Sequence, residues 1–111
     1  MARRQWLYVL RPTRPEMLTE GPSDTERASV QRHVAYHVDL ASKGIDIMVG
    51  RTQTNTPDTI GVSVFFADDE AAARAIMLAD PTVADGVMTG ELFPYRIAMG
   101  NAESMKEALE D

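Results

Sequence analysis

Three segments of the chain show the spacing of branched and aromatic residues that is typical of β-strands. Gln5 to Arg11 is rich in such residues and is followed by Pro12, which predicts a first strand. Ile45 to Gly50 and Thr59 to Ala67 alternate with a period of two, as strands with one buried face do. Because Asn55 to Asp58 has strong turn composition, we expect these two strands to form a hairpin. In the second strand the alternation assigns one face to Ile45, Ile47 and Val49 and the other to Asp46, Met48 and Gly50.

Apolar residues at helical spacing predict a long first helix from Ser23 to Lys43. Ser23 and Glu26 have the arrangement of a capping box, in which each side chain satisfies the exposed amide of the other residue. Gly44 provides a C-terminal stop. The stripe expected to face the core includes both histidines of the chain and consists of Val30, His33, Val34, His37, Leu40 and Ala41.

An alanine-rich segment predicts a second, shorter helix. It begins after Asp68 and Asp69 and ends near Asp80, because Pro81 disfavours helical geometry in the residue before it. Its apolar positions are Ala72, Ala75, Ile76 and Ala79. Val87 to Met99 predicts the last strand, with Pro94 at an edge or bulge. The order β-α-β-β-α-β predicts an α+β fold of the ferredoxin-like type, with two helices on one face of a four-stranded antiparallel sheet.

One face of this sheet is left without helices. We expect apolar side chains to lie uncovered there, among them Trp6 or Leu7, Met48, Phe65 and Phe93. Such a face favours a homodimer in which a second subunit covers it. Residues 1–100 form the predicted domain, and residues 101–111 form a tail. Because the tail has apolar residues at roughly helical spacing, it either docks on the partner or frays.

Composition and charge narrow the classes of function. The chain has 111 residues, 44% hydrophobic and 25% charged, which is the size and balance of one globular domain. Eleven basic and seventeen acidic side chains give a net charge of −6, which argues against nucleic acid as a partner. Cysteine is absent, so thiolate nucleophiles, disulfides and thiolate metal sites are excluded. The sequence contains neither a membrane-length apolar run nor the pattern of a signal peptide, so we expect a cytoplasmic protein without a membrane partner.

One set of motifs is shared with a known family. The motifs are His33 with Gly44 eleven positions later, a strand reaching Gly50, the segment A-D-P-T-V-A-D-G-V at residues 79–87, and Phe93-Pro94-Tyr95. Together they resemble the YciI-like (YCII-related) domain over roughly residues 5–99. The resemblance implies a dimeric α+β barrel with a pocket between helix and sheet, and a paired His and Asp as the active site, which map onto His33 and Asp80. For some relatives it implies dehalogenation or ring chemistry on hydroxylated aromatics. The family often has Gly-Pro after the second strand, whereas Arg51 follows Gly50 here and places a cation near the pocket.

A histidine on a helix and an aspartate from a distant segment form a minimal acid–base pair. The carboxylate fixes the tautomer of the imidazole and stabilises its protonated form, which leaves the other ring nitrogen to move a proton without a cofactor. Asp80 also precedes Pro81, where a carboxylate can simply organise the turn that ends a helix. These two roles are compatible. His33 lies at the edge of the helical stripe and His37 nearer its centre, so His33 is better placed to reach a pocket.

Other polar residues are candidates for binding a metal or a substrate, and most of them have a structural or surface role as the alternative. His33 and His37 lie four positions apart, a spacing that can hold a metal ion, but no third ligand accompanies them, so we expect no metal and interpret His37 as a core or supporting residue. Arg51 is a candidate for binding substrate, with a solvated surface cation as its alternative. Tyr8 and Ser63 lie on strands expected to line the cleft and can donate hydrogen bonds to a bound oxygen. The proline-rich segment 11–22 is either a lid or a plain connector.

The sequence favours a small enzyme that needs no cofactor and acts on a small-molecule ligand. In this interpretation His33 is the general acid or base and Asp80 orients it, on an aromatic or carboxylated metabolite, by proton transfer, isomerisation or elimination. The alternative is a non-catalytic dimeric module that binds a small molecule or a protein, with His33 and Asp80 serving packing and a turn. A distance beyond about 6 Å between His33 and Asp80 would exclude the acid–base pair.

Overall fold

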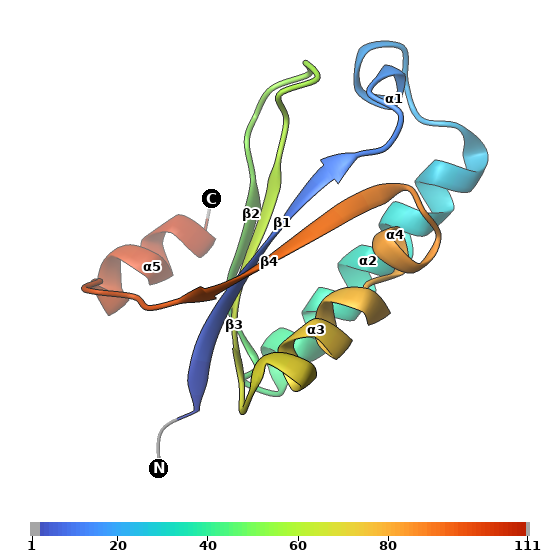
Figure 1. Cartoon of the computed structure of the whole chain (residues 1–111). Helices are drawn as coiled ribbons and strands as arrows, with labels where there is room; N and C mark the ends of the chain where they lie inside the picture. The colour runs from blue at the N-terminus through green and yellow to red at the C-terminus, as the bar shows by residue number, and fades with distance from the viewer. Residues whose placement is uncertain (1–2, 111) are drawn as a thin grey trace.

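Four antiparallel strands form the centre of the structure, a computed structural model that describes residues 3–110 (Figure 1). The sheet has the order β2-β3-β1-β4. Its strands are β1 (Arg4–Pro12), β2 (Asp46–Arg51), β3 (Gly61–Ala67) and β4 (Met88–Tyr95). β1 lies in the middle and pairs along its length with both β3 and β4, as its run of branched and aromatic residues favours.

The described residues also form five helices. They are α1 (Glu16–Thr19), α2 (Asp24–Ser42), α3 (Glu70–Ala79), α4 (Pro81–Ala84) and α5 (Ala102–Leu109). In Figure 1, α2, α3 and α4 lie on one side of the sheet and α5 lies on the other. The predicted ferredoxin-like fold is therefore confirmed, with the short helices α1 and α4 added to the two expected, and with α5 in the tail whose apolar residues have helical spacing. Among the described residues, no helix has the length and apolar character needed to cross a bilayer.

The start of α2 is fixed by the predicted capping box. Ser23 Oγ accepts a hydrogen bond from the Glu26 amide at 3.1 Å, and Glu26 Oε1 accepts one from the Ser23 amide at 2.8 Å. Glu26 also accepts two hydrogen bonds from Arg14, at 3.0 and 2.7 Å. Because Arg14 lies in the segment between β1 and α2, this ion pair fastens that segment to the first turn of the helix. The side chain of Met17 in α1 is buried and anchors the segment a second time.

The core lies between the sheet and the helices, and its composition corrects two sequence predictions. Phe65, expected on the uncovered face, is 0% exposed and pairs with Trp6, which is 2% exposed, because both face the helical layer. Leu7 faces the other way, beside Phe93 of β4. In α3 the buried residues are Ala73 and Met77 rather than the alanines expected from the spacing.

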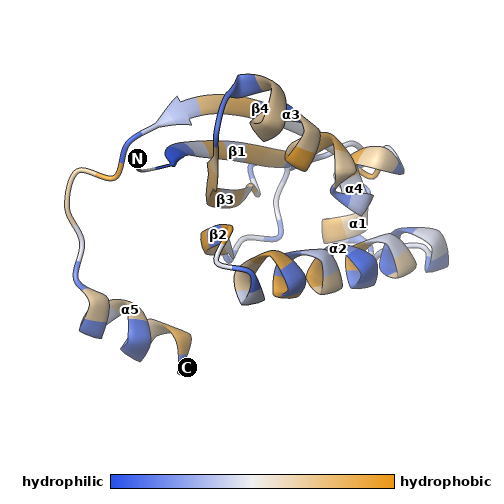
Figure 2. Ribbon diagram, turned by 90° about the horizontal axis from the view of Figure 1, so that it is seen from below, coloured by the Kyte–Doolittle hydropathy of each residue, from blue (hydrophilic) through white to orange (hydrophobic). Residues whose placement is uncertain are grey.

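The last strand is shorter than predicted. It ends at Tyr95, which pairs with Gln5 near the start of β1. The chain then runs without regular structure to α5, which begins at an Asn101 cap and contains no buried residue. Figure 2 shows α5 standing apart from the sheet and from the other helices.

Candidate active site

A cavity of about 610 Å³ lies between α2, the segment that carries α1, and the hairpin of β2 and β3. It explains why part of the predicted stripe of α2 is not buried. Val34 is 54% exposed, and Val49 on the facing strand is 42% exposed, although both are apolar. Both line the cavity, which is open to solvent, so their side chains face that space instead of a packed neighbour. The cavity is therefore a preformed apolar site of the kind that binds small molecules.

His33 and Asp80 meet at the wall of this cavity. His33 Nδ1 lies 2.9 Å from each carboxylate oxygen of Asp80, well inside the limit set by the sequence analysis. The His33 side chain is 20% exposed and lines the cavity, whereas that of Asp80 is fully buried. Of the two ring nitrogens of His33, only Nδ1 has a hydrogen-bond partner among residues 3–110. Nε2 is left as the ring nitrogen that can exchange a proton with a ligand.

Asp80 occupies the junction between α3 and α4. Its Oδ1 atom accepts hydrogen bonds from the amide of Thr82 at 3.0 Å and from Thr82 Oγ1 at 2.8 Å, which caps α4, while Pro81 fills the first position of that helix. The A-D-P-T sequence thus builds a turn that fixes the carboxylate. The structural role expected of Asp80 and its contact with His33 occur together.

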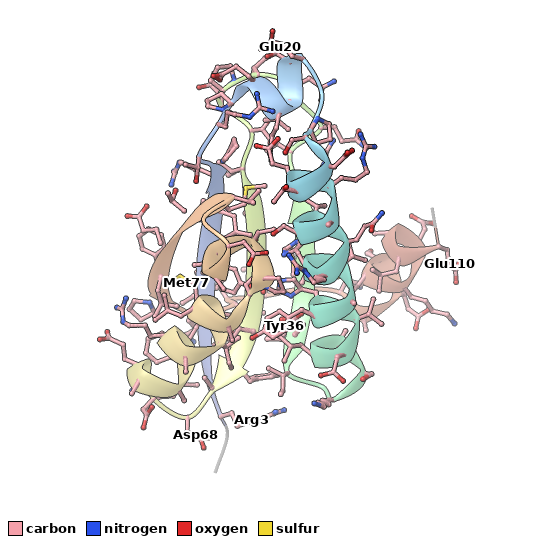
Figure 3. All side chains as sticks on the ribbon, turned by 90° about the vertical axis from the view of Figure 1, so that its right-hand side faces the viewer. Arg3, Glu20, Tyr36, Asp68, Met77 and Glu110 are labelled. Carbon is pink, nitrogen blue, oxygen red and sulfur yellow. The ribbon has the colours of Figure 1, made fainter. Side chains whose placement is uncertain are left out.

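Two further side chains reach the same carboxylate, one from the central strand β1 and one from α2; Figure 3 looks onto α2 with the sheet behind it. Tyr8 donates its hydroxyl proton to Asp80 Oδ2 at 2.7 Å. His37 Nε2 lies 3.0 Å from Oδ2, and the other ring nitrogen, Nδ1, lies 2.6 Å from Asp46 Oδ2. Asp80 is thus an acceptor for four residues, although it has no contact with solvent.

The contacts of this cluster displace several pKa values from their usual range. Burial would lower the pKa of His37, but hydrogen bonds to Asp46 and Asp80 outweigh burial and raise it to about 9. Burial would likewise raise the pKa of Asp80, yet hydrogen bonds from His33 and His37 hold it well below the usual range. Burial and the nearby charge of Asp80 raise the pKa of Tyr8 far above that of a free phenol. At neutral pH the cluster therefore contains an Asp80 carboxylate, a His37 imidazolium and a neutral Tyr8.

The three predicted substrate-binding residues, Tyr8, Ser63 and Arg51, all line the cavity. The hydroxyls of Tyr8 and Ser63 already have hydrogen-bond acceptors within the protein. The hydroxyl proton of Tyr8 goes to Asp80, and Ser63 Oγ donates to Asp46 Oδ1 at 3.2 Å, so both hydroxyls are directed into the cluster and not toward a bound oxygen. Arg51 lies at the end of β2, is exposed and lines the cavity. Among residues 3–110 it forms no ion pair.

Asp46 is the residue of the cluster that the sequence analysis missed. The alternation of β2 assigned it to the face opposite Ile45 and Ile47, but its side chain is only 2% exposed. A break in the register between Asp46 and Met48 makes Asp46 pair with Phe65 and turns it toward the helices. The strand pattern carries no signal for such a bulge. The one available signal is a carboxylate between two isoleucines, nine positions after a histidine.

The atoms that could bind a metal are engaged with one another. Ligand atoms of His33, His37 and Asp80 lie within 4.8 Å of one another. The hydrogen bonds described above use each of these groups, and among the described residues no buried side-chain nitrogen or oxygen lacks a partner. A cation would have to displace these hydrogen bonds, so the donor set fits an acid–base cluster better than a metal centre.

Comparisons with known proteins found one family model and several solved structures that match this chain. The family model described as YCII-related domain matches residues 6–94. A search of curated proteins found no match. Among solved structures, 5-chloro-2-hydroxyhydroquinone dehydrochlorinase (TftG) from Burkholderia phenoliruptrix AC1100, in complex with 2,5-dihydroxybenzoquinone, has a TM-score of 0.60 and 15% identity, covering 82% of this chain and 93% of that one. SnoaB, a cofactor-independent oxygenase from Streptomyces nogalater, has a TM-score of 0.45 and 15% identity, covering 90% of this chain and 100% of that one.

Proposed function

The chain belongs to the YCII-related domain family, and on this premise we propose that it is a small cofactor-independent enzyme in which His33 transfers a proton and Asp80 orients it. One observation carries the proposal. His33 lines an apolar cavity of about 610 Å³ and gives only its Nδ1 atom to Asp80, at 2.9 Å. A histidine kept merely for packing has no need of a cavity beside its second ring nitrogen.

The contact with Asp80 defines the chemistry of His33. Because the carboxylate is an acceptor, it holds the proton of the neutral imidazole on Nδ1 and leaves the lone pair of Nε2 available as a base. When Nε2 takes a proton from a substrate, Asp80 stabilises the imidazolium that forms, and the proton can then be returned to another atom of the substrate. Proton transfer, isomerisation and elimination all follow this sequence.

The walls of the cavity indicate the class of substrate. Apolar side chains dominate them, with Leu10, Met17 and Val30 among them, and two exposed cations border the cavity, Arg27 and Arg51. We infer a ring-sized, largely apolar compound with an anionic or hydroxyl substituent that an arginine can bind. The dehydrochlorinase of the same fold was solved with 2,5-dihydroxybenzoquinone, which supports hydroxylated aromatic rings as the first compounds to test.

The test is a panel of hydroxylated and halogenated aromatic compounds, with binding followed by NMR of the histidine side chains and turnover followed by absorbance. Wild type is expected to bind and convert at least one compound. His33→Gln should still bind it but lose turnover by about 10²–10⁴-fold, the contribution of a general acid or base. Asp58→Asn, on an exposed turn, is the control and should behave as wild type. Equal turnover by His33→Gln would refute the role of His33, and binding without turnover by wild type would favour the binding module.

We also infer that two copies of the chain pair through the open face of the sheet. Phe93 and Met48 are 39% and 41% exposed on that face, and Leu7 lies beside Phe93. α5, whose Leu109 is 74% exposed, stands on the same side, and none of its residues is buried by the part of the chain that the structure describes. Sedimentation should give twice the mass of one chain, and Phe93→Glu should shift it toward the monomer. A wild-type monomer at high concentration would refute the dimer.

A further inference from the structure

A β-bulge in β2 brings a second aspartate into the candidate active site. Asp46 pairs with Phe65, but Met48, two positions later, pairs with Val64, so one residue of β2 has no counterpart. Without the extra residue, Asp46 and Met48 would point to the same face, and Asp46 would lie on the open side of the sheet. With it, Asp46 faces the helices, where its side chain is 2% exposed.

His37 lies between this aspartate and Asp80. Its Nδ1 atom is 2.6 Å from Asp46 Oδ2 and its Nε2 atom is 3.0 Å from Asp80 Oδ2. A neutral imidazole has a single N–H and would leave one of the two carboxylates facing a lone pair. Only the imidazolium donates to both acceptors. The raised pKa of His37 agrees with this geometry.

We propose that Asp46 and His37 are positioning residues, a second carboxylate–imidazole pair that holds the Asp80 carboxylate in the orientation His33 requires. This inference rests on the proposed function of His33. The four side chains form one continuous series, Asp46–His37–Asp80–His33, in which every link is a hydrogen bond of 3.0 Å or less. His37 acts through Asp80, because its two ring nitrogens already have partners inside the series.

The balance of charge in the cluster supports this role. Two carboxylates, Asp46 and Asp80, share the one imidazolium of His37, so one negative charge remains to stabilise the proton that His33 takes up. Two uncompensated carboxylates would be costly to bury, and Asp80 would then be displaced or protonated. The ionisable side chains that face His37 come from β1, β2, α2 and the α3–α4 junction, and are Tyr8, Asp46, His33, Tyr36 and Asp80.

The first test uses the wild-type protein alone. Nitrogen NMR at pH 8 should show both ring nitrogens of His37 protonated, whereas an ordinary histidine is neutral at this pH. A single protonated nitrogen at pH 8 would overturn the proposal. This measurement needs no substrate and no variant, so it decides the matter even if a variant fails to fold.

The second test removes the charge of Asp46 and keeps the size of its side chain. In Asp46→Asn the pKa of His37 should fall by about 1–3 pH units, the effect of losing an adjacent opposite charge, and the Nδ1 proton signal of His33 should move with it. The matched control is Asp39→Asn. Asp39 is an exposed carboxylate on α2, the helix that carries both histidines, and it pairs with Lys43, so this variant should leave both signals unchanged. Identical His37 titrations in wild type and Asp46→Asn would overturn the proposal.

Turnover separates positioning from packing. If a compound is converted, Asp46→Asn should lower kcat by about 10-fold or more with little change in KM, as expected for the partner of a reacting histidine. Unchanged kcat despite the altered His37 would show that the pair serves only packing and would refute the positioning role. If instead His33→Gln retains turnover, the proposed function fails while the protonation of His37 stands as measured, so the two failures are distinguishable.

Discussion

His33 and Asp80 lie 47 positions apart in the chain, yet His33 Nδ1 is 2.9 Å from both carboxylate oxygens of Asp80. The contact joins the middle of α2 to the junction of α3 and α4. Tyr8 of β1 adds its hydroxyl to the same carboxylate, at 2.7 Å. One buried side chain thus ties the long helix, the short helices and the central strand of the sheet together. Stability and chemistry depend on the same atoms, which leads to the first prediction.

Replacing Asp80 with alanine is expected to lower the free energy of unfolding by about 3–5 kcal/mol, the cost of leaving a buried charge without its partner. His37 would keep only one of its two carboxylates, and the donors of Thr82 would lose their acceptor. Asp80→Asn retains an acceptor oxygen for the cap and should cost less. Urea unfolding followed by circular dichroism measures both variants. A loss below about 1 kcal/mol in Asp80→Ala would contradict a tightly coupled buried network.

The stability of the protein should fall as the pH rises from neutral. The pKa of His37 is raised from 6.5 to about 9 in the folded chain, so its contribution is complete below pH 6.5 and is lost as the pH rises through about 9. The measurement is the urea midpoint at intervals from pH 6 to 9.5. His37→Gln is the control and should show a flatter profile over this range. If the urea midpoint of the wild-type protein stayed constant between pH 6.5 and 9, the prediction would be wrong.

Breaking the ion pair of Arg14 with Glu26 should loosen the segment over the cavity. In Arg14→Ala the amides of residues 14–21 are expected to exchange hydrogen faster, because the burial of Met17 and the hydrogen bond from the Thr13 amide to Val87 O then hold the segment without the ion pair. The hydrogen bonds from Arg14 lower the pKa of Glu26 to about 2, so the ion pair stabilises the fold above pH 4.5 and ceases to do so as the pH falls through 2.

Two comparisons check this account of Arg14. The difference in urea midpoint between Arg14→Ala and wild type should be present at pH 7 and vanish near pH 2. Arg11→Ala removes an ion pair with Glu91 whose side chains are both more than half exposed, and it should leave the exchange of residues 14–21 unchanged. Equal exchange rates in Arg14→Ala and wild type would show that the pair does not hold the segment.

Adding one methyl group at Gly90 should destabilise the packing of α3 on β4. A Cβ atom there would lie 2.9 Å from Met77 Sδ and 3.1 Å from Met77 Cγ, and Met77 is 3% exposed in the core. We expect Gly90→Ala to cost about 1–3 kcal/mol, as overpacked cores do. Gly50→Ala, where nothing lies within 4 Å of the added atom, should change stability by less than about 0.5 kcal/mol. Thermal unfolding of the two variants side by side tests the difference.

Local chemistry explains which parts of the fold the sequence predicted. The capping box of Ser23 and Glu26 and the stop before Pro81 depend on neighbouring residues alone, and both occur as expected. The face assigned to Phe65 was wrong, and the choice between Trp6 and Leu7 for the open face stayed undecided, because a strand of continuous apolar residues does not reveal which side the helices cover. Val34 was expected in the core, and the space beside it depends on how α2 lies over the sheet, which periodicity does not describe.

The candidate site also has one part that the sequence predicted and another that it did not. The proximity of His33 and Asp80 followed from a shared motif, and the structure brings them into contact. Asp46 was assigned to the open face, because alternation holds only while every residue of a strand has a partner, and the bulge in β2 breaks that rule. Tyr8 and Ser63 were predicted to donate hydrogen bonds to a bound ligand, but they donate to Asp80 and Asp46. Their hydroxyls have carboxylate partners nearby that the sequence did not indicate.

The place of Asp80 at the start of α4 has a consequence for the unfolding of the protein. This helix is a single turn, Pro81–Ala84, and the oxygen that caps it belongs to the carboxylate that holds His33. Unwinding that turn would withdraw the acceptor from His33. Because the same carboxylate also binds Tyr8 of the central strand, the cap of α4, the orientation of His33 and the attachment of the helices to the sheet are lost together.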